Sequence, residues 1–406
     1  MLHHRPLFAA ALVLMLAAAP ALAQKHYDRG ADDTTIKIGN IMPYSGPASA
    51  YGVIGKTEEA YFRMINDQGG INGRKIVFIS YDDGYSPPKT VEQARRLVES
   101  DEVLLIFQSL GTAANSAIMR YMNAKKVPQL FVSTGATKFG ENPKAFPYTM
   151  GWQPNYRAEG LIYARYLLDT KPDARIAVLV QNDDYGKDLL RSLKAGLGDK
   201  AGTMVVAEAP FEVSEPTIDS QIVKLKASGA DVLMTFGVPK FAAQAIRKVA
   251  ELEWKPLHIV NNVSASVGAV LKPAGLENAR GVVTTAYLKD PTDTAWQDDP
   301  AMKEWHAFLD KYYPDADRTN ANILYGYAVS QTLKYVLQQC GDDLTHDNIM
   351  RQAASMRDLD NSLLLPGIRI NTGPNDFFPI EQMQMARFNG ERWDRFGPVL
   401  SADPHD

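Results

Sequence analysis

The chain has 406 residues, of which 45% are hydrophobic and 22% are charged, and its formal net charge at pH 7 is -4. This balance is typical of a globular protein, and it excludes the basic excess that nucleic-acid binding or attraction to an anionic membrane requires. The chain is also longer than one hydrophobic core usually organises, so we expect at least two lobes.

Residues 1–23 have the order of a secretory signal peptide. Arg5 precedes an apolar run, and an A-x-A-like cleavage motif follows the run at 21–23. The run is shorter than the roughly 20 apolar residues of a membrane-spanning helix. We therefore predict export, cleavage near Gln24, and no insertion of the mature protein in a membrane.

Short apolar segments alternate with longer segments of helical periodicity in the first part of the mature chain. The alternation of strand-like and helix-like patterns favours a parallel sheet covered by helices. The predicted elements, in chain order, are the strand 35–41, the helix 57–68, the strand 75–81, the helix 90–100, the strand 103–107, the helix 112–124 and the strand 129–132.

The same alternation restarts after a segment rich in proline and aromatic residues, 146–154, which we interpret as the first crossover between lobes. Two such series predict an α/β protein with two doubly wound, Rossmann-like lobes, each with a parallel sheet. The predicted elements of the second series are the strand 176–180, the helix 186–197, the strand 204–207, the helix 218–227 and the strand 231–236.

The turns that follow strands are the candidate binding segments, because ligands of open parallel sheets bind outside the carboxyl ends of the strands. In the turn 108–115, Thr112 begins a helix, where free amides and a hydroxyl suit a carboxylate. A helix cap would by itself explain Thr112. The next turn offers the same groups, so an anion site and a cap are equally well supported. The candidate residues are Gly111, Thr112, Ser133, Thr134, Gly135 and Ala136.

The sequence lacks the motifs that would mark an enzyme. No G-x-S-x-G and no H-E-x-x-H occurs, and no G-x-G-x-x-G follows a predicted strand. Cys340, the only cysteine, is interpreted as a buried small residue that forms no intramolecular disulfide. The acidic pairs at 82–83 and 183–184 are interpreted as caps or turns rather than metal ligands. We expect a protein that is not an enzyme and has no cofactor.

Four stretches of the chain carry a resemblance to a known family. They are Met42-Pro43-Tyr44-Ser45-Gly46-Pro47 with Tyr51-Gly52, Ile65-Asn66 through Gly69-Gly70-Ile71-Asn72-Gly73, Tyr81-Asp82-Asp83 with Pro88, and Asn182-Asp183-Asp184-Tyr185-Gly186. In this order and spacing the chain resembles the solute-binding proteins of the leucine/isoleucine/valine type. These are receptors of ATP-driven importers for branched-chain amino acids, amides, urea and aromatic acids.

The resemblance implies a type I periplasmic binding protein, in which three crossing strands join two lobes that close on a ligand. The lobes are expected to comprise 34–151 with 285–375, and 152–284 with 376–400. The protein would be a periplasmic monomer that delivers a small-molecule solute to a membrane permease and its ATPase. A sensory module of the same fold is the alternative, and the absence of a signalling segment after Leu400 favours transport.

The resemblance also assigns roles to residues of the site. It maps the carboxylate-binding hydroxyl to Thr112 and a second carboxylate-binding loop to 133–136. It maps the aromatic walls of the two lobes to Tyr51 and Tyr185. Trp152 is expected either to pack in the hinge or to clasp a ring of the ligand.

One departure from the family pattern concerns the ligand's charge. Relatives that bind amino acids place an acidic residue in a second-lobe loop, whereas no Asp or Glu occurs between Lys255 and Gly275 here. A buried ammonium without a partner is costly. We therefore expect an aromatic carboxylate without an α-ammonium, with Asn262 near a distal hydroxyl. A branched-chain amino acid, an amide or urea is the alternative.

Overall fold

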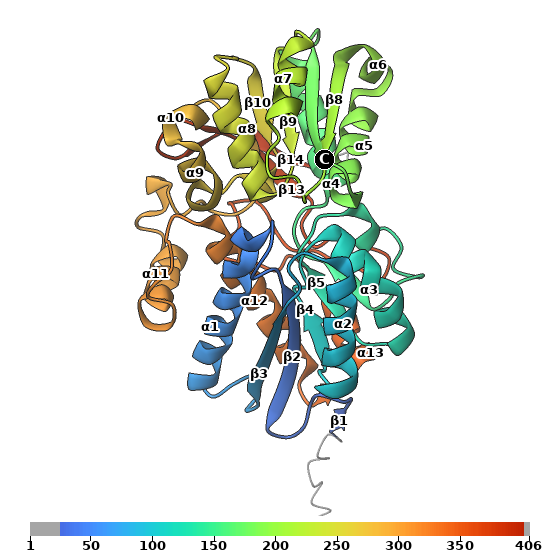
Figure 1. Cartoon of the computed structure of the whole chain (residues 1–406). Helices are drawn as coiled ribbons and strands as arrows, with labels where there is room; N and C mark the ends of the chain where they lie inside the picture. The colour runs from blue at the N-terminus through green and yellow to red at the C-terminus, as the bar shows by residue number, and fades with distance from the viewer. Residues whose placement is uncertain (1–24, 402–406) are drawn as a thin grey trace, which may run out of the picture.

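The computed structural model describes residues 25–401, so the predicted signal peptide, residues 1–23, lies outside the described residues. The described chain forms two α/β lobes, and each lobe is built around its own sheet. Figure 1 shows the lobes stacked end to end, with β2 to β5 in the lower lobe and β7 to β10 in the upper lobe. A separate pair of short parallel strands, β1 (His26–Tyr27) and β12 (Asp343–Leu344), lies at the bottom of the lower lobe.

A parallel five-stranded sheet in the order β3-β2-β4-β5-β6 organises the first lobe. Helices α2 and α3 cover one face, while α1 and α12 pack against each other on the opposite face. Because both faces are covered, β4 and β5 are buried along their whole length. The strands are β2 (Thr35–Met42), β3 (Lys75–Asp82), β4 (Leu105–Phe107), β5 (Gln129–Val132) and β6 (Thr149–Gly151), and the helices are α1 (Val53–Asp67), α2 (Pro87–Arg95), α3 (Thr112–Lys125), α11 (Pro300–Tyr312), α12 (Ala321–Cys340) and α13 (His346–Ala353).

A seven-stranded sheet in the order β14-β13-β11-β10-β9-β7-β8 organises the second lobe. The strands β8, β7, β9, β10 and β11 run parallel, whereas β13 is antiparallel to both β11 and β14. The strands are β7 (Ile176–Gln181), β8 (Val205–Phe211), β9 (Val232–Phe236), β10 (Leu257–Val260), β11 (Val283–Ala286), β13 (Gln382–Phe388) and β14 (Trp393–Ser401). The helices are α4 (Tyr156–Thr170), α5 (Asp184–Leu197), α6 (Ala201–Met204), α7 (Asp219–Ala227), α8 (Pro239–Glu251), α9 (Lys272–Ala274) and α10 (Leu276–Ala279).

The structure differs from the sequence-based expectation in two places. The segment 146–154, expected to be only a crossover, contains β6, which pairs with β5 and completes the first sheet. The second sheet is mixed rather than wholly parallel. The reason is that the chain enters this sheet for the last time as β13, and a tight turn at Asn389 to Arg392 then returns it as β14.

The chain passes between the lobes three times, after β6, after β11 and before β13. Trp152 lies in the first passage and is fully buried. Its indole nitrogen donates to Thr332 Oγ1 at 3.0 Å, and its ring meets those of Tyr287 and Tyr325 edge-on. Of the two roles expected for Trp152, the structure supports hinge packing. The exact residue boundaries of the lobes stay predictions.

We expect Trp152→Ala to lower the free energy of unfolding by about 3 to 5 kcal/mol, because it leaves a cavity among buried rings. Trp152→Phe keeps a ring and loses one hydrogen bond, so its cost should be about 1 kcal/mol. Urea unfolding of the ligand-free protein measures both. Trp254→Ala, at a partly buried tryptophan of the second lobe, serves as the control. An equal loss in Trp152→Ala and Trp254→Ala would contradict the role of Trp152.

Candidate functional site

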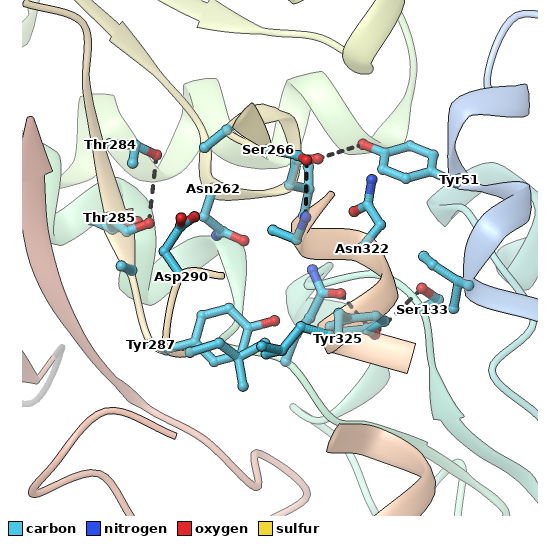
Figure 2. Close-up of a pocket in the computed structure, with 18 of the residues that line it drawn as sticks. Tyr51, Ser133, Asn262, Ser266, Thr284, Thr285, Tyr287, Asp290, Asn322 and Tyr325 are labelled. Atoms are coloured by element: carbon cyan, nitrogen blue, oxygen red, sulfur yellow. Dashed lines mark hydrogen bonds between the residues drawn. The ribbon is translucent and has the colours of Figure 1, made fainter. Parts of the chain in front are cut away.

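A cavity lies between the two lobes, and the empty space in it and in the solvent at its open mouth is together about 1110 Å³. Its walls come from both lobes and from the second passage between them (Figure 2). Six tyrosine and two tryptophan side chains take part in the lining and provide rigid surfaces that suit a flat, largely apolar ligand. The lining tyrosines are Tyr51, Tyr85, Tyr156, Tyr185, Tyr287 and Tyr325.

The start of α3 forms one wall of this cavity. Gly111 precedes the helix with φ of +99°, and a Cβ atom there would lie 2.7 Å from the ring of Tyr85, so both the backbone and the space require glycine. The backbone amides of the first turn, 112–114, have no hydrogen-bond partner within the described residues 25–401. Because unpaired amides and the helix dipole favour negative charge, this wall suits an anion.

Two threonine side chains complete this wall. Thr112 Oγ1 and Thr134 Oγ1 lie 2.7 Å apart and share one hydrogen bond, which either hydroxyl can donate. When Thr134 donates, the Thr112 proton is available to a ligand; when Thr112 donates, Thr134 can donate to the Tyr156 hydroxyl at 3.5 Å. Thr112 does not cap α3, since its side chain bonds Thr134 rather than a helix amide. Ser133 Oγ lies 3.3 Å from the hydroxyl of Tyr325 and also lines the cavity.

The structure brings Tyr51, Gly111, Thr112, Ser133, Thr134, Tyr185 and Asn262 together around one cavity. The remaining two candidates, Gly135 and Ala136, do not line it. A Cβ atom on Gly135 would lie 2.5 Å from the carbonyl oxygen of Pro154, so glycine is required there by the close approach of the chain. The amide of Ala136 donates to Thr134 Oγ1 at 3.1 Å. Gly135 and Ala136 therefore help to position Thr134 and do not face the cavity.

The second lobe contributes Tyr185 and Asn262. The Tyr185 hydroxyl donates to Asn261 Oδ1 at 2.9 Å. The backbone amide and the side-chain nitrogen of Asn262 both donate to the carboxyl group of Glu159 at 2.7 Å. The Asn262 side-chain nitrogen has one proton beyond its bond to Glu159, and the side-chain oxygen is an acceptor that suits a hydroxyl group.

The two lobes touch at several points. The Tyr51 hydroxyl of the first lobe donates to the Val263 carbonyl of the second at 2.9 Å. Lys138 pairs with Asp184 at 2.7 Å, and the Ser266 hydroxyl donates to Asn320. The lobes are therefore in direct contact across the cleft, as is expected for a closed form. Further contacts between the lobes join Thr137 to Asp188, Gly268 to Thr319 and Lys272 to Thr319.

Comparison with known proteins identifies the family. A family model described as periplasmic binding protein matches residues 35–392. The chain belongs to the periplasmic binding protein family. It is 29% identical over 322 residues to the Leu/Ile/Val-binding protein homolog 1 of Brucella abortus (strain 2308), with 76% of this chain and 79% of the relative covered.

Solved structures share the fold of this periplasmic binding protein. A branched-chain amino acid ABC transporter structure from Thermus thermophilus with bound valine has a TM-score of 0.81 at 14% identity, covering 91% of this chain and 96% of the other. A fatty acid ABC transporter substrate-binding protein from Thermomonospora curvata has a TM-score of 0.76 at 21% identity, with coverages of 93% and 95%. The family and the fold are those of solute-binding proteins.

Sequence reasoning missed an acidic group in this binding protein. The loop after β10 carries no carboxylate, but Asp290, which follows β11, lines the same cavity, as does Asp293. The absence of a carboxylate between Lys255 and Gly275 holds, but it does not describe the whole second side of the pocket. Asp290 lies outside that loop, and only the folded arrangement of the second passage brings it to the wall. The one usable signal was that Asp290 lies in the turn after a strand.

The structure accounts for two residues that the sequence indicated to be structural, Asp183 and Cys340. Asp183 caps α5 by accepting from two of its backbone amides. Cys340 is buried, and burial raises the pKa of its thiol to about 12.

Between residues 25 and 401 no group of three or more His, Cys, Asp or Glu side chains is placed to hold a metal ion. None of the helices in this range combines the length and the apolar character that a membrane crossing requires.

Tyr51→Phe should speed ligand release, because the Tyr51 hydroxyl bonds the Val263 carbonyl across the closed lobes. The loss of one such hydrogen bond costs about 0.5 to 1.5 kcal/mol, which is a weakening of about two- to twelvefold. Stopped-flow release kinetics measures the effect, and Tyr335→Phe, outside the cleft on α12, is the matched control. Equal release rates in the two variants would show that the contact does not stabilise closure.

Glu159 generates a prediction on pH. It is fully buried, and burial raises the pKa of its carboxyl group from 4.5 to about 7, although Tyr163, Thr285 and Asn262 donate to it. Between these two values the folded protein holds a proton that the unfolded chain has released, so stability falls as the pH rises through this window. Below pH 4.5 both states hold the proton, and above pH 7 neither does.

Glu159→Gln lacks this titration. The free energy of unfolding of Glu159→Gln, relative to that of the unsubstituted protein, should therefore increase by up to about 3 kcal/mol between pH 4.5 and 7.5. Urea unfolding across this range measures the difference. A difference that stays constant with pH would contradict the raised pKa of Glu159.

Proposed function

We propose that this periplasmic binding protein captures an aromatic carboxylate between its lobes in the periplasm and delivers it to an ABC permease and its ATPase. The observation that carries the proposal is the combination of free amides and hydroxyls at the start of α3 with a cavity wall of six tyrosines. The first set of groups matches a carboxylate, and the second set matches a ring.

The donors near Thr112 are neutral. Among the described residues, the lysine and arginine side chains that line the cavity are Lys289 and Arg395, from the second passage and from β14. Burial raises the pKa of the Tyr51 and Tyr325 phenols above the usual value, so both are neutral donors at pH 7. A carboxylate held here is stabilised by hydrogen bonds and the α3 dipole rather than by an ion pair.

Closure provides the route from binding to transport. A ligand that touches Thr112 in the first lobe and Tyr185 in the second gains its full contacts only when the lobes meet. It therefore shifts the population toward the closed form, which a permease can recognise by shape.

Branched-chain amino acids are the second candidate. The names of the Brucella relative and of the Thermus structure refer to such ligands, and the Asp290 carboxylate is a group of the kind that pairs with an ammonium. The two candidates differ in one chemical group, the α-ammonium, so matched ligand pairs separate them.

Calorimetric titration with benzoate, cinnamate, leucine and phenylalanine tests the proposal, and we expect the two acids without an amine to bind more tightly. Thr112→Val keeps the shape but removes a donor to a charged group, so it should weaken acid binding by about 1.5 to 3 kcal/mol. Thr170→Val, at an exposed threonine that ends α4, is the control. Tighter binding of leucine or phenylalanine than of both acids would overturn the assignment.

A further inference from the structure

The Asp290 carboxylate faces the cavity with one of its oxygens unused. Oδ1 accepts hydrogen bonds from the backbone amide of Thr292 at 2.8 Å and from the Thr292 hydroxyl. Oδ2 has no hydrogen-bond donor among residues 25–401. Figure 2 shows Asp290 on the side of the pocket opposite to Ser133 and Tyr51. The cavity therefore has an unmatched acceptor far from the start of α3.

The cations closest to Asp290 in the lining are engaged with other groups. Lys289 pairs with Asp299 at 2.6 Å. Arg395 stacks on the ring of Trp296 at 4.7 Å, and its nearest carboxylate is Asp293 at 4.0 Å. Asp290 takes part in none of the ion pairs of the described chain. A ligand that donates a hydrogen bond to the unused Asp290 oxygen therefore binds with a more favourable free energy than a ligand that leaves this oxygen without a donor.

Burial raises the pKa of Asp290 to about 6, and the neighbouring Asp293 adds to the shift. The group is therefore still mainly ionised at pH 7.5, where it accepts hydrogen bonds and donates none. An acceptor of this kind selects for a ligand group that donates and against an isosteric group that cannot.

A hydroxyl group suits this position better than the α-ammonium of an amino acid. Lys289 and Arg395 line the same cavity, but each already lies beside a carboxylate, Asp299 and Asp293. An α-ammonium is attached one carbon from its carboxylate. An amino acid whose carboxylate is bound at Thr112 would therefore keep its ammonium at that end of the cavity, away from Asp290.

We propose that Asp290 determines specificity by accepting a hydrogen bond from a hydroxyl on the ligand's ring, so the ligand class is a hydroxylated aromatic acid. This inference rests on the proposed function, because it places the carboxylate of the same ligand at Thr112. The ring lies between the two ends, against the tyrosines of the wall.

Calorimetric titration at pH 7.5 with benzoate and its 4-hydroxy, 4-methoxy and 4-aminomethyl derivatives tests the inference. In the unsubstituted protein the 4-hydroxy acid should bind at least about tenfold more tightly than the 4-methoxy acid, because the methoxy oxygen cannot donate. Asp290→Asn replaces one carboxylate oxygen, which accepts hydrogen bonds, with an amide nitrogen, which can donate into the cavity. We expect it to lower this ratio at least about fivefold while binding of benzoate changes less than about threefold.

Asp298→Asn removes the same charge from an exposed position of the same segment and should leave the ratio unchanged. Retained benzoate binding by Asp290→Asn shows that this variant is folded. The inference is overturned if the ratio is the same in Asp290→Asn as in the unsubstituted protein, or if the 4-aminomethyl acid binds more tightly than the 4-hydroxy acid. If acids bind without preference for the hydroxyl, only the inference fails. If none of the acids binds, the proposed function fails as well.

Discussion

The carboxyl ends of the parallel strands in the two sheets face each other across the cleft, and the arrangement of the site depends on this constraint. Tyr51 follows β2, Thr112 follows β4, Tyr185 follows β7, Asn262 follows β10 and Asp290 follows β11. A parallel strand directs the next turn and the next helix N-terminus to the same edge of its sheet. Two sheets joined by three passages therefore concentrate donors, acceptors and rings in one cavity, although each sheet alone supplies only half of it.

The polar groups of this cavity are divided between its two ends. The end at α3 contains donors, since the first-turn amides and the Thr112 and Thr134 hydroxyls carry no formal charge and favour an anion. The opposite end contains two acceptors, the Asn262 side-chain oxygen and the Asp290 carboxylate. It also contains the cations Lys289 and Arg395, which lie beside Asp299 and Asp293. A ligand with an acid at one end and a hydroxyl donor at the other matches the free amides of α3 and the unused Asp290 oxygen, whereas the reverse orientation would place its carboxylate beside that of Asp290.

The proposed function requires that closure depend on the ligand, and the direct contacts between lobes are individually weak enough to allow this. Lys138 and Asp184 keep 37% and 52% of their side chains exposed, so water and salt screen this pair and its contribution is below about 1 kcal/mol. The Tyr51 to Val263 hydrogen bond contributes a similar amount. Each of these contacts contributes too little free energy to hold the lobes together by itself. In the proposed function, a ligand bound to both lobes determines the population of the closed form.

The sequence by itself determined the strands and helices whose patterns are local, and with them the residues that directly follow strand ends. Thr112 was found in this way, because a turn after a parallel strand has a known place at the sheet edge. The roles expected for Tyr51, Tyr185 and Asn262 came from the resemblance to the family. β6 was missed, since its three residues, Thr-Met-Gly, show neither a periodicity nor an apolar run. The inward or outward direction of side chains within the turn 133–136 was also beyond the sequence. It depends on how closely Pro154 approaches Gly135.

Only the tertiary structure decided which distant segments complete the cavity. Tyr325 comes from the middle of α12 and Asp290 from the second passage, more than a hundred residues beyond Thr112 in the chain. Hydrophobic periodicity indicates which face of a helix or strand is buried, but it does not indicate which other element packs against that face. The hinge sets those meetings through packing around Trp152, Tyr287 and Tyr325, so the far end of the pocket became visible only in the folded chain.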